Sequence, residues 1–380
     1  MSAPNPTCAA GVPWYVWCSV AAVTSAVIGT QWDISWHESI GRDTFWTPAH
    51  MAIHLCGVLA GISCVYLIFS TTLGAHSALR ACSVRLWGFY GPLGAFIAAW
   101  GGVAMITSAP FDNWWHNAYG LDVKILSPPH MLLAAGVMAV QVGTLILVLG
   151  QMNRAKGALA RRLRVFYLYV GGLMLLSLAT VQMEVTVRNL MHTAHFYLVV
   201  SLVAPLVFGG ISRGSSFRWA ATTVAGIYTA VMLLLLWILP LFPAEPKLGP
   251  VYQNVTHFVP PEFPLLLIAP ALLLDLFWQR TAWRGWRLAL ASSGLFLAVF
   301  ALVQWPFANF LMSAEARNRI FGVGYFAYFV RPTSLYATYR FVALERGEAL
   351  WREIGLAALT ATAGAWLGIA WGDRMRHIRR

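Results

Sequence analysis

The stretch MLLAAGVMAVQVGTLILVLG, residues 131–150, contains no charged side chain and is long enough to cross a bilayer as a single helix. Similar apolar runs recur along the chain, which has 59% hydrophobic residues, 11% charged residues and a mean hydropathy of +0.65. We therefore predict an all-α integral membrane protein, a polytopic helical bundle with about ten transmembrane helices. The predicted spans lie near residues 12–31, 48–73, 84–108, 129–152, 163–183, 191–212, 217–241, 262–279, 286–311 and 354–372.

The distribution of Lys and Arg predicts the orientation of these spans. Most of the 26 basic residues fall in alternate connections and in the C-terminal tail, in clusters such as 154–164, 280–287 and 374–380. The positive-inside rule assigns these clusters to the cytoplasm. We therefore expect a bacterial inner-membrane protein with both termini in the cytoplasm and the loops near 32–50 and 112–130 on the periplasmic side. The net charge of +12 then indicates contact with the anionic headgroups of the lipid bilayer, and not with nucleic acid.

Polar residues gather at the first of these outer loops, QWDISWHESIGRDTFWTPAHMAIHL, residues 31–55. Asp33 and His37 are four residues apart, so their side chains share one face of a helix. His50 stands in the expected first turn of the next span, which begins at Pro48. A short loop makes the two spans neighbours, so we expect the three side chains to converge.

The second outer loop, SAPFDNWWHNAYGLDVKILSPPHMLL at residues 108–133, repeats this arrangement with Asp112, His116 and His130. One carboxylate and two imidazoles are a ligand set for a transition metal, and copper, zinc and non-haem iron all remain open. A lone histidine at a helix end is more often a hydrogen-bonded structural residue, but a triad that recurs at the same topological position favours metal. The sequence therefore predicts two metal sites and an internal helix-loop-helix repeat.

Other residues are weaker candidates. We expect Glu38, Arg42 and Asp43 to orient the imidazoles of the first site, and they are the residues we consider for a catalytic role there. Weaker metal ligands are His54, His192, His195, His257 and Glu262. The five cysteines form no C-x-x-C pair, and we assign them no chemistry. We expect residues 1–152 to form a duplicated metal-binding unit, and residues 153–380 to form further transmembrane helices that serve as scaffold or as a partner or substrate surface.

The first motif also resembles a known family. WDISWHESIGRDTFWTPAH, residues 32–50, is similar to the metal-binding segment of the C subunit of particulate methane and ammonia monooxygenases. The resemblance covers roughly residues 25–150 and implies copper bound by Asp33, His37 and His50. It implies a second copper site at Asp112, His116 and His130, with Asp112 where the family has Asn. It supports a copper membrane site better than it supports methane or ammonia as the substrate, since the region after residue 150 matches none of the family's other subunits.

Three classes of function are compatible with these patterns. The first is an oxygen-activating copper monooxygenase, or a subunit of one, that acts on a small apolar substrate and takes electrons from a donor such as quinol. The second is a copper or zinc transporter or delivery protein, although the Met residues are scattered and no charged track crosses the spans. The third is a structural or assembly subunit whose metals staple helices together. Other membrane subunits or a homo-oligomer are possible partners in each case.

Overall fold

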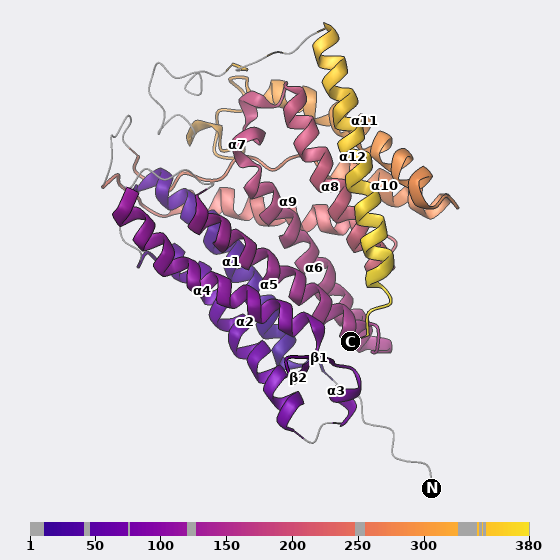
Figure 1. The fold of residues 1–380 in the computed structure, drawn as a ribbon. Coiled ribbons are helices and arrows are strands. Elements are labelled where there is room, and N and C mark those ends of the chain that lie inside the picture. The colour runs from indigo at the N-terminus through magenta and orange to yellow at the C-terminus, as the bar shows by residue number, and fades with distance from the viewer. Residues whose placement is uncertain are drawn as a thin grey trace. The chain divides into compact units, whose positions relative to one another are not determined.

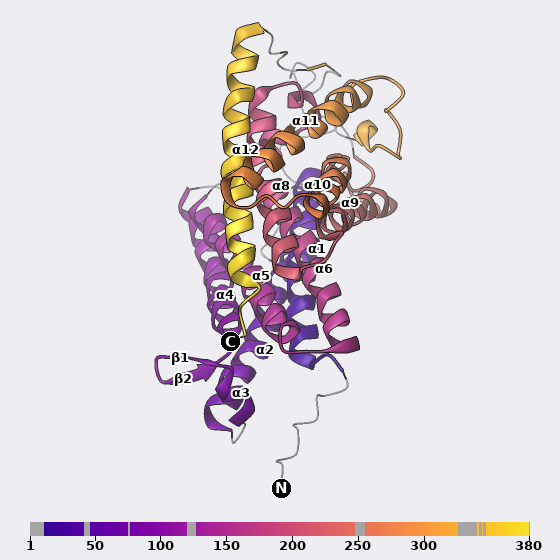
Figure 2. The same ribbon diagram turned by 90° about the vertical axis from the view of Figure 1, so that its right-hand side faces the viewer.

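The computed structural model describes residues 11–41, 46–74, 77–119, 127–247, 255–325, 340–341, 344 and 347–379. Most of these residues are helical, which confirms the predicted all-α class (Figures 1 and 2). The helices are α1 (Trp14–Ser39), α2 (Pro48–Leu73), α3 (Ser77–Ala81), α4 (Leu93–Tyr119), α5 (Pro128–Met152), α6 (Gly157–Val181), α7 (Met183–Thr186), η1 (Arg188–Leu190), α8 (Ala194–Ser215), α9 (Ala220–Ile238), η2 (Leu239–Leu241), α10 (Ile268–Arg280), α11 (Gly285–Leu311), η3 (Val323–Tyr325) and α12 (Gly347–Met375). A short hairpin pairs β1 (Val84–Leu86) with β2 (Phe89–Gly91).

In the described part of the chain, 8 helices are long and apolar enough to cross a membrane, which indicates an integral membrane protein. They are α2, α4, α5, α6, α8, α9 together with η2, α11 and α12. The predicted count of about ten spans is therefore not confirmed. The predicted span 12–31 corresponds to α1, which is long but carries Gln31, Asp33 and His37 near its C-terminal end.

The predicted span 262–279 is wrong in its boundaries. The chain has no helix from Thr256 to Leu266, and α10 then forms a helix of only 13 residues. At 1.5 Å per residue such a helix is about 20 Å long, against about 30 Å for the hydrocarbon core. Pro260, Pro261 and Pro264 explain the late start, because proline lacks the backbone N–H and disfavours a helical conformation in the residue before it.

The predicted span 84–108 also starts too early. The β1–β2 hairpin occupies its first residues, and α4 begins at Leu93. The hairpin turn holds Trp87 at φ 49° and Gly88 at φ 86°, the left-handed backbone that a tight two-residue turn requires. The apolar residues Leu86, Trp87 and Phe89 thus belong to a β-hairpin, which hydropathy alone does not predict.

The described contacts group the chain into two compact units. The first comprises Met1–Ala26, Ala52–Val170 and Arg374–Arg380, and the second comprises Val27–Met51 and Gly171–Asp373. Each candidate metal triad lies within one unit, the Asp33 triad in the second and the Asp112 triad in the first. Neither unit has a limit at residue 152. The division into 1–152 and 153–380 therefore stays a prediction.

The first unit is held together by the closely packed pair α4 and α5, which lie side by side in Figures 1 and 2. A Cβ atom added at Gly101 would stand 2.7 Å from the carbonyl oxygen of Gly136 and 2.7 Å from the backbone nitrogen of Val140. Glycine at this crossing lets the two backbones touch, as small residues commonly do between membrane helices. This packing fixes the ends of α4 and α5, which carry the second triad.

We expect the substitution Gly101→Ala to destabilise the protein by about 1–3 kcal/mol, because the added methyl group forces the α4 and α5 backbones apart. Gly61→Ala in α2 is the matched control, since a Cβ atom there would meet nothing within 4 Å. Alanine is the better helix former, so the control should be neutral or slightly stabilising. Thermal unfolding in detergent measures both, and equal midpoints for the two variants would contradict the close crossing.

The second unit contains a similar glycine-mediated crossing between α8 and α12. Gly364 and Gly368 of α12 face the backbone of α8 at Leu202 and Leu206 so closely that a side chain has no room. Near the end of this contact, Arg213 of α8 donates to the Asp373 carboxylate, with Nη2 2.7 Å from Oδ1. The last predicted span therefore forms a long helix, α12, that packs on α8.

Candidate metal centres

The first triad lies at the junction of α1 and α2. Asp33 and His37 come from the last two turns of α1, and His50 is the third residue of α2. The Oδ1 atom of Asp33 is 3.6 Å from Nε2 of His37 and 3.1 Å from Nε2 of His50. The Thr47 hydroxyl accepts a hydrogen bond from the backbone N–H of His50 at 3.2 Å, which fixes the start of α2. The three side chains are half-buried.

The second triad repeats this geometry at the junction of α4 and α5. Asp112 and His116 lie in the last turns of α4, and His130 is the third residue of α5, which starts with Pro128. The Oδ1 atom of Asp112 is 3.2 Å from Nε2 of His116 and 3.4 Å from Nε2 of His130. His116 is the buried member, with 8% of its surface exposed.

Both triads fit a transition-metal ion. In each triad the carboxylate oxygen and the two imidazole nitrogens lie within 4.8 Å of one another. A metal bound at about 2.0–2.2 Å holds neighbouring ligand atoms roughly 3.0–3.5 Å apart, the range into which most of the carboxylate–imidazole distances fall. Three protein ligands leave positions open for water, oxygen or a substrate. Among the described residues, these two triads are the sets of three or more His, Cys, Asp or Glu side chains that could hold a metal in this way.

The weaker candidate His192 has a packing role. Its ring is stacked between Trp305 and Phe341, with ring centroids at 4.0 and 3.7 Å, and its Nε2 atom is 3.1 Å from the carbonyl oxygen of Trp305. Burial lowers the pKa of His192, against the opposing effect of the Trp305 carbonyl. The described contacts of His192 are thus packing contacts, and this residue belongs to neither triad.

The remaining weaker candidates stay outside the two triads as well. His54 follows His50 by one turn of α2. His195 is exposed at the start of α8. His257 is exposed and its Nδ1 atom lies 2.9 Å from the Thr256 hydroxyl. In the described part of the chain, none of them joins a group with metal-ligand geometry.

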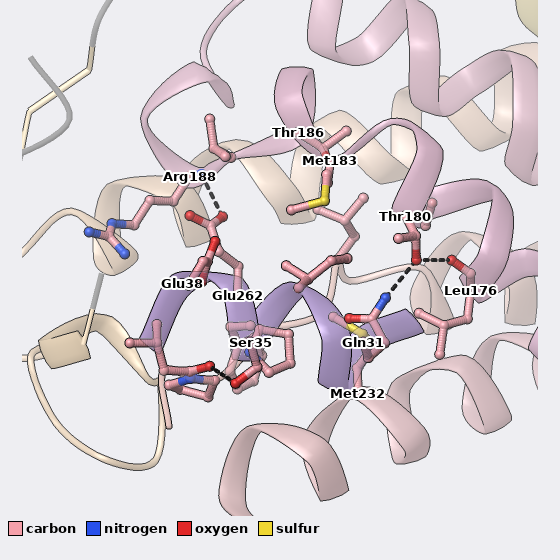
Figure 3. Close-up of a pocket in the computed structure, with 18 of the residues that line it drawn as sticks. Gln31, Ser35, Glu38, Leu176, Thr180, Met183, Thr186, Arg188, Met232 and Glu262 are labelled. Atoms are coloured by element: carbon pink, nitrogen blue, oxygen red, sulfur yellow. Dashed lines mark hydrogen bonds between the residues drawn. The ribbon is translucent and has the colours of Figure 1, made fainter. Parts of the chain in front are cut away.

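Two of the three residues expected to orient the first site, Arg42 and Asp43, lie outside the described residues. The third, Glu38, lines a pocket together with Glu262, and Figure 3 shows their carboxyl groups near the Arg188 backbone. Glu262 accepts a hydrogen bond from the backbone N–H of Arg188 at 2.8 Å. Sequence reasoning singled out both carboxylates for metal chemistry and missed the pocket that they share.

The geometry therefore brings together all six residues that the two motifs predicted as principal ligands, in two separate groups. That a metal binds there, and that residues 25–150 are related to the monooxygenase C subunit, stay predictions. Comparisons with protein-family models, with curated proteins and with solved structures found no match.

Proposed function

We propose that the chain is a copper-binding membrane protein that acts as an oxygen-activating monooxygenase, or as a subunit of one, on a small apolar substrate. The observation that carries the proposal is the recurrence of one carboxylate and two imidazoles, in the same geometry, at two helix junctions. The ligand set alone is compatible with zinc and with non-haem iron. The resemblance of residues 32–50 to a copper-binding segment favours copper.

The residues of each triad have distinct tasks in this proposal. The two histidines would offer their Nε2 atoms, and Asp33 or Asp112 would offer a carboxylate oxygen whose negative charge offsets part of the charge of a metal cation. Copper, when bound, supplies the one-electron redox chemistry that activates dioxygen. Because each triad draws its ligands from two consecutive helices, the helix ends hold the ligands in place before metal arrives.

The residues that precede Asp33 and His37 in the chain belong to an apolar cluster. Trp32 and Trp36 of α1 pack against a buried cluster of Ile40, Leu239, Ala244 and Phe258. The rings of Trp36 and Phe258 have centroids 5.8 Å apart. Exclusion of water strengthens electrostatic interactions at a reactive site and limits side reactions. This environment suits a small apolar substrate that arrives through the bilayer.

The reaction also requires partners. The ligands supply no reducing equivalents, so we propose a quinol of the surrounding bilayer as electron donor. A homo-oligomer or other membrane subunits would complete the assembly. Location in a bacterial inner membrane, with cytoplasmic termini and periplasmic triads, belongs to the same proposal and rests on the distribution of basic residues.

Oxygen consumption tests this function. Protein purified in mild detergent is loaded with copper and mixed with a reduced quinol, and oxygen uptake is followed beside the double variant His37→Ala/His116→Ala. We expect sustained uptake by the wild type and only background uptake by the variant. Equal rates for the two proteins, or no uptake by copper-loaded wild type, would exclude an oxygen-activating role for the triads.

A structural role is the second candidate, and one observation favours it. Each triad ties the C-terminal end of one helix to the first turn of the next, which is where a metal staple would stabilise a helix pair. In that case zinc should raise the unfolding temperature as much as copper does, with no oxygen uptake. A copper-specific effect on oxygen uptake would favour the enzyme.

A further inference from the structure

The second unit contains a cavity of about 250 Å³ that the metal triads do not use (Figure 3). Its walls come from α1, α6, α7, η1, α9 and the non-helical segment 259–265. On α1 the lining residues are Gln31, Ile34, Ser35 and Glu38. With 3.6 residues per turn, these four share a face of α1 that differs from the one carrying Asp33 and His37. The cavity is therefore a separate site on the same helix.

Three hydrogen-bond acceptors from distant parts of the chain line this cavity: Glu38, Glu262 and Asn189. Glu262 already accepts the backbone N–H of Arg188 at 2.8 Å and has further lone pairs to offer. Asn189 is only 4% exposed, and its Oδ1 atom has no hydrogen-bond partner among the described residues. Burying a hydrogen-bond acceptor without a donor costs free energy. A ligand that donates a hydrogen bond to Asn189 Oδ1 would remove this cost.

The ionisable groups in the cavity suit a cation. They are Glu38, Glu262 and Arg188, which supply two carboxyl groups and one guanidinium. Burial, and after it the nearby Glu262, raises the pKa of the Glu38 carboxyl to about 8, which favours its protonated form at neutral pH when no cation is beside it. Burial raises the pKa of the Glu262 carboxyl, and the nearby Arg188 opposes that rise. A ligand with one positive charge would favour the ionised form of the Glu38 carboxyl and donate hydrogen bonds at the same time.

The rest of the cavity is apolar and suits a compact hydrocarbon body. Ile34, Leu176, Met183, Val187 and Met232 contribute to its walls. Methionine sulfur makes favourable contacts with aromatic rings and adapts to their shape. A dry cavity of about 150 Å³ is sufficient to hold benzene, so the larger cavity has room for a ring that bears a charged head.

We propose that this cavity binds a small organic ammonium ion, with its charged head between Glu38 and Glu262 and its apolar body against the methionine-lined wall. The proposal is independent of the metal chemistry, because Glu38 lies on a different face of α1 from Asp33 and His37. Asn189 and Glu262 belong to other segments of the chain. Ser35 and Gln31 keep the cavity wall in place. Ser35 Oγ donates to the Val259 carbonyl at 2.5 Å, and Gln31 Nε2 donates to Thr180 Oγ1 at 2.6 Å (Figure 3).

Calorimetric titration of the full chain in detergent with benzylammonium, and with its neutral analogue benzyl alcohol, tests the proposal. We expect benzylammonium to bind the wild type about tenfold or more tightly than benzyl alcohol does, because only the ammonium carries the balancing charge. Equal affinities, preference for the alcohol, or no binding of benzylammonium would overturn it. This comparison uses only the wild type and therefore does not depend on the folding of a variant.

Substitutions then locate the site. Glu38→Gln and Glu262→Gln keep the shape of the side chain and should each weaken benzylammonium binding about tenfold or more. Glu315→Gln removes the same charge from an exposed position and should bind as the wild type does. His37→Ala should also bind normally, so that failure of the metal proposal and failure of this one are distinguishable. Unchanged affinity in both carboxylate variants would place the ligand elsewhere.

Discussion

Replacing His116 by alanine should remove one copper ion per chain and leave the other bound at the Asp33 triad. His116 is the buried ligand of its site, and its Nε2 atom lies 3.2 Å from Asp112 Oδ1. Without this imidazole only Asp112 and His130 remain, too few ligands to hold a transition metal in place. Loss of groups that merely support a ligand costs 10–100-fold in metal affinity, so loss of the ligand itself should cost at least about 100-fold.

His37→Ala should have the reciprocal effect, with copper retained at the Asp112 triad. Metal content is measured by mass spectrometry on protein purified from copper-replete cells. The matched control is His195→Ala, which removes an exposed imidazole from the start of α8 and should leave about two coppers per chain. Simultaneous loss of both ions in either single variant would mean that the triads form one coupled centre. If all variants retain zinc, the result would contradict the proposal that the triads bind copper.

The sequence is sufficient to predict this candidate site because its geometry is local. Asp33 and His37 must share a helix face at a spacing of four, and Pro48 starts the next helix two residues before His50. A loop of a few residues then leaves little freedom for how the ligands meet. The apolar runs likewise predict the helical class, since only a closed hydrogen-bond pattern is stable in lipid.

Local sequence patterns of this kind do not predict the cavity beside α1. Glu38, Asn189 and Glu262 belong to three segments far apart in the chain, and no periodicity links them. The same holds for the two compact units, because the contacts that join Val27–Met51 to Gly171–Asp373 are tertiary. One signal was present: carboxylates next to apolar spans are expensive to bury and therefore mark sites. In the sequence, Glu38 stands out by its position beside the first triad and Glu262 as a weaker metal ligand, and neither observation indicates that the two line one cavity.

Asp275 shows why an acidic residue near a predicted span need not belong to a transport track. It lies in α10, is 2% exposed, and accepts hydrogen bonds from the first turn of α9. Its carboxylate accepts the backbone N–H of Ala221 at 3.2 Å, the backbone N–H of Thr222 at 2.8 Å and the Thr222 hydroxyl at 2.8 Å. The residue before α9, Trp219, provides no side-chain cap. Asp275 is thus a cap supplied by a neighbouring helix.

We expect Asp275→Ala to lower the free energy of unfolding by about 3 kcal/mol. Two backbone N–H groups at the start of α9 would lose their acceptor in a buried place, and the negative charge that favours a helix N-terminus would be lost with them. Asp275→Asn keeps an oxygen that can accept from one N–H and should cost about 1 kcal/mol. Chemical denaturation in detergent measures both variants.

The outcome separates a cap from a residue that serves transport. If Asp275 is a cap, Asp275→Ala loses more stability than Asp275→Asn does. The metal content of the folded protein should then be unchanged, because among the described residues neither triad draws a ligand from α9 or α10. If Asp275→Ala has the same free energy of unfolding as the wild type but no longer transports metal, the three hydrogen bonds do not stabilise α9. Asp275 would then be free for a role in moving cations, and the transporter function would become the stronger hypothesis.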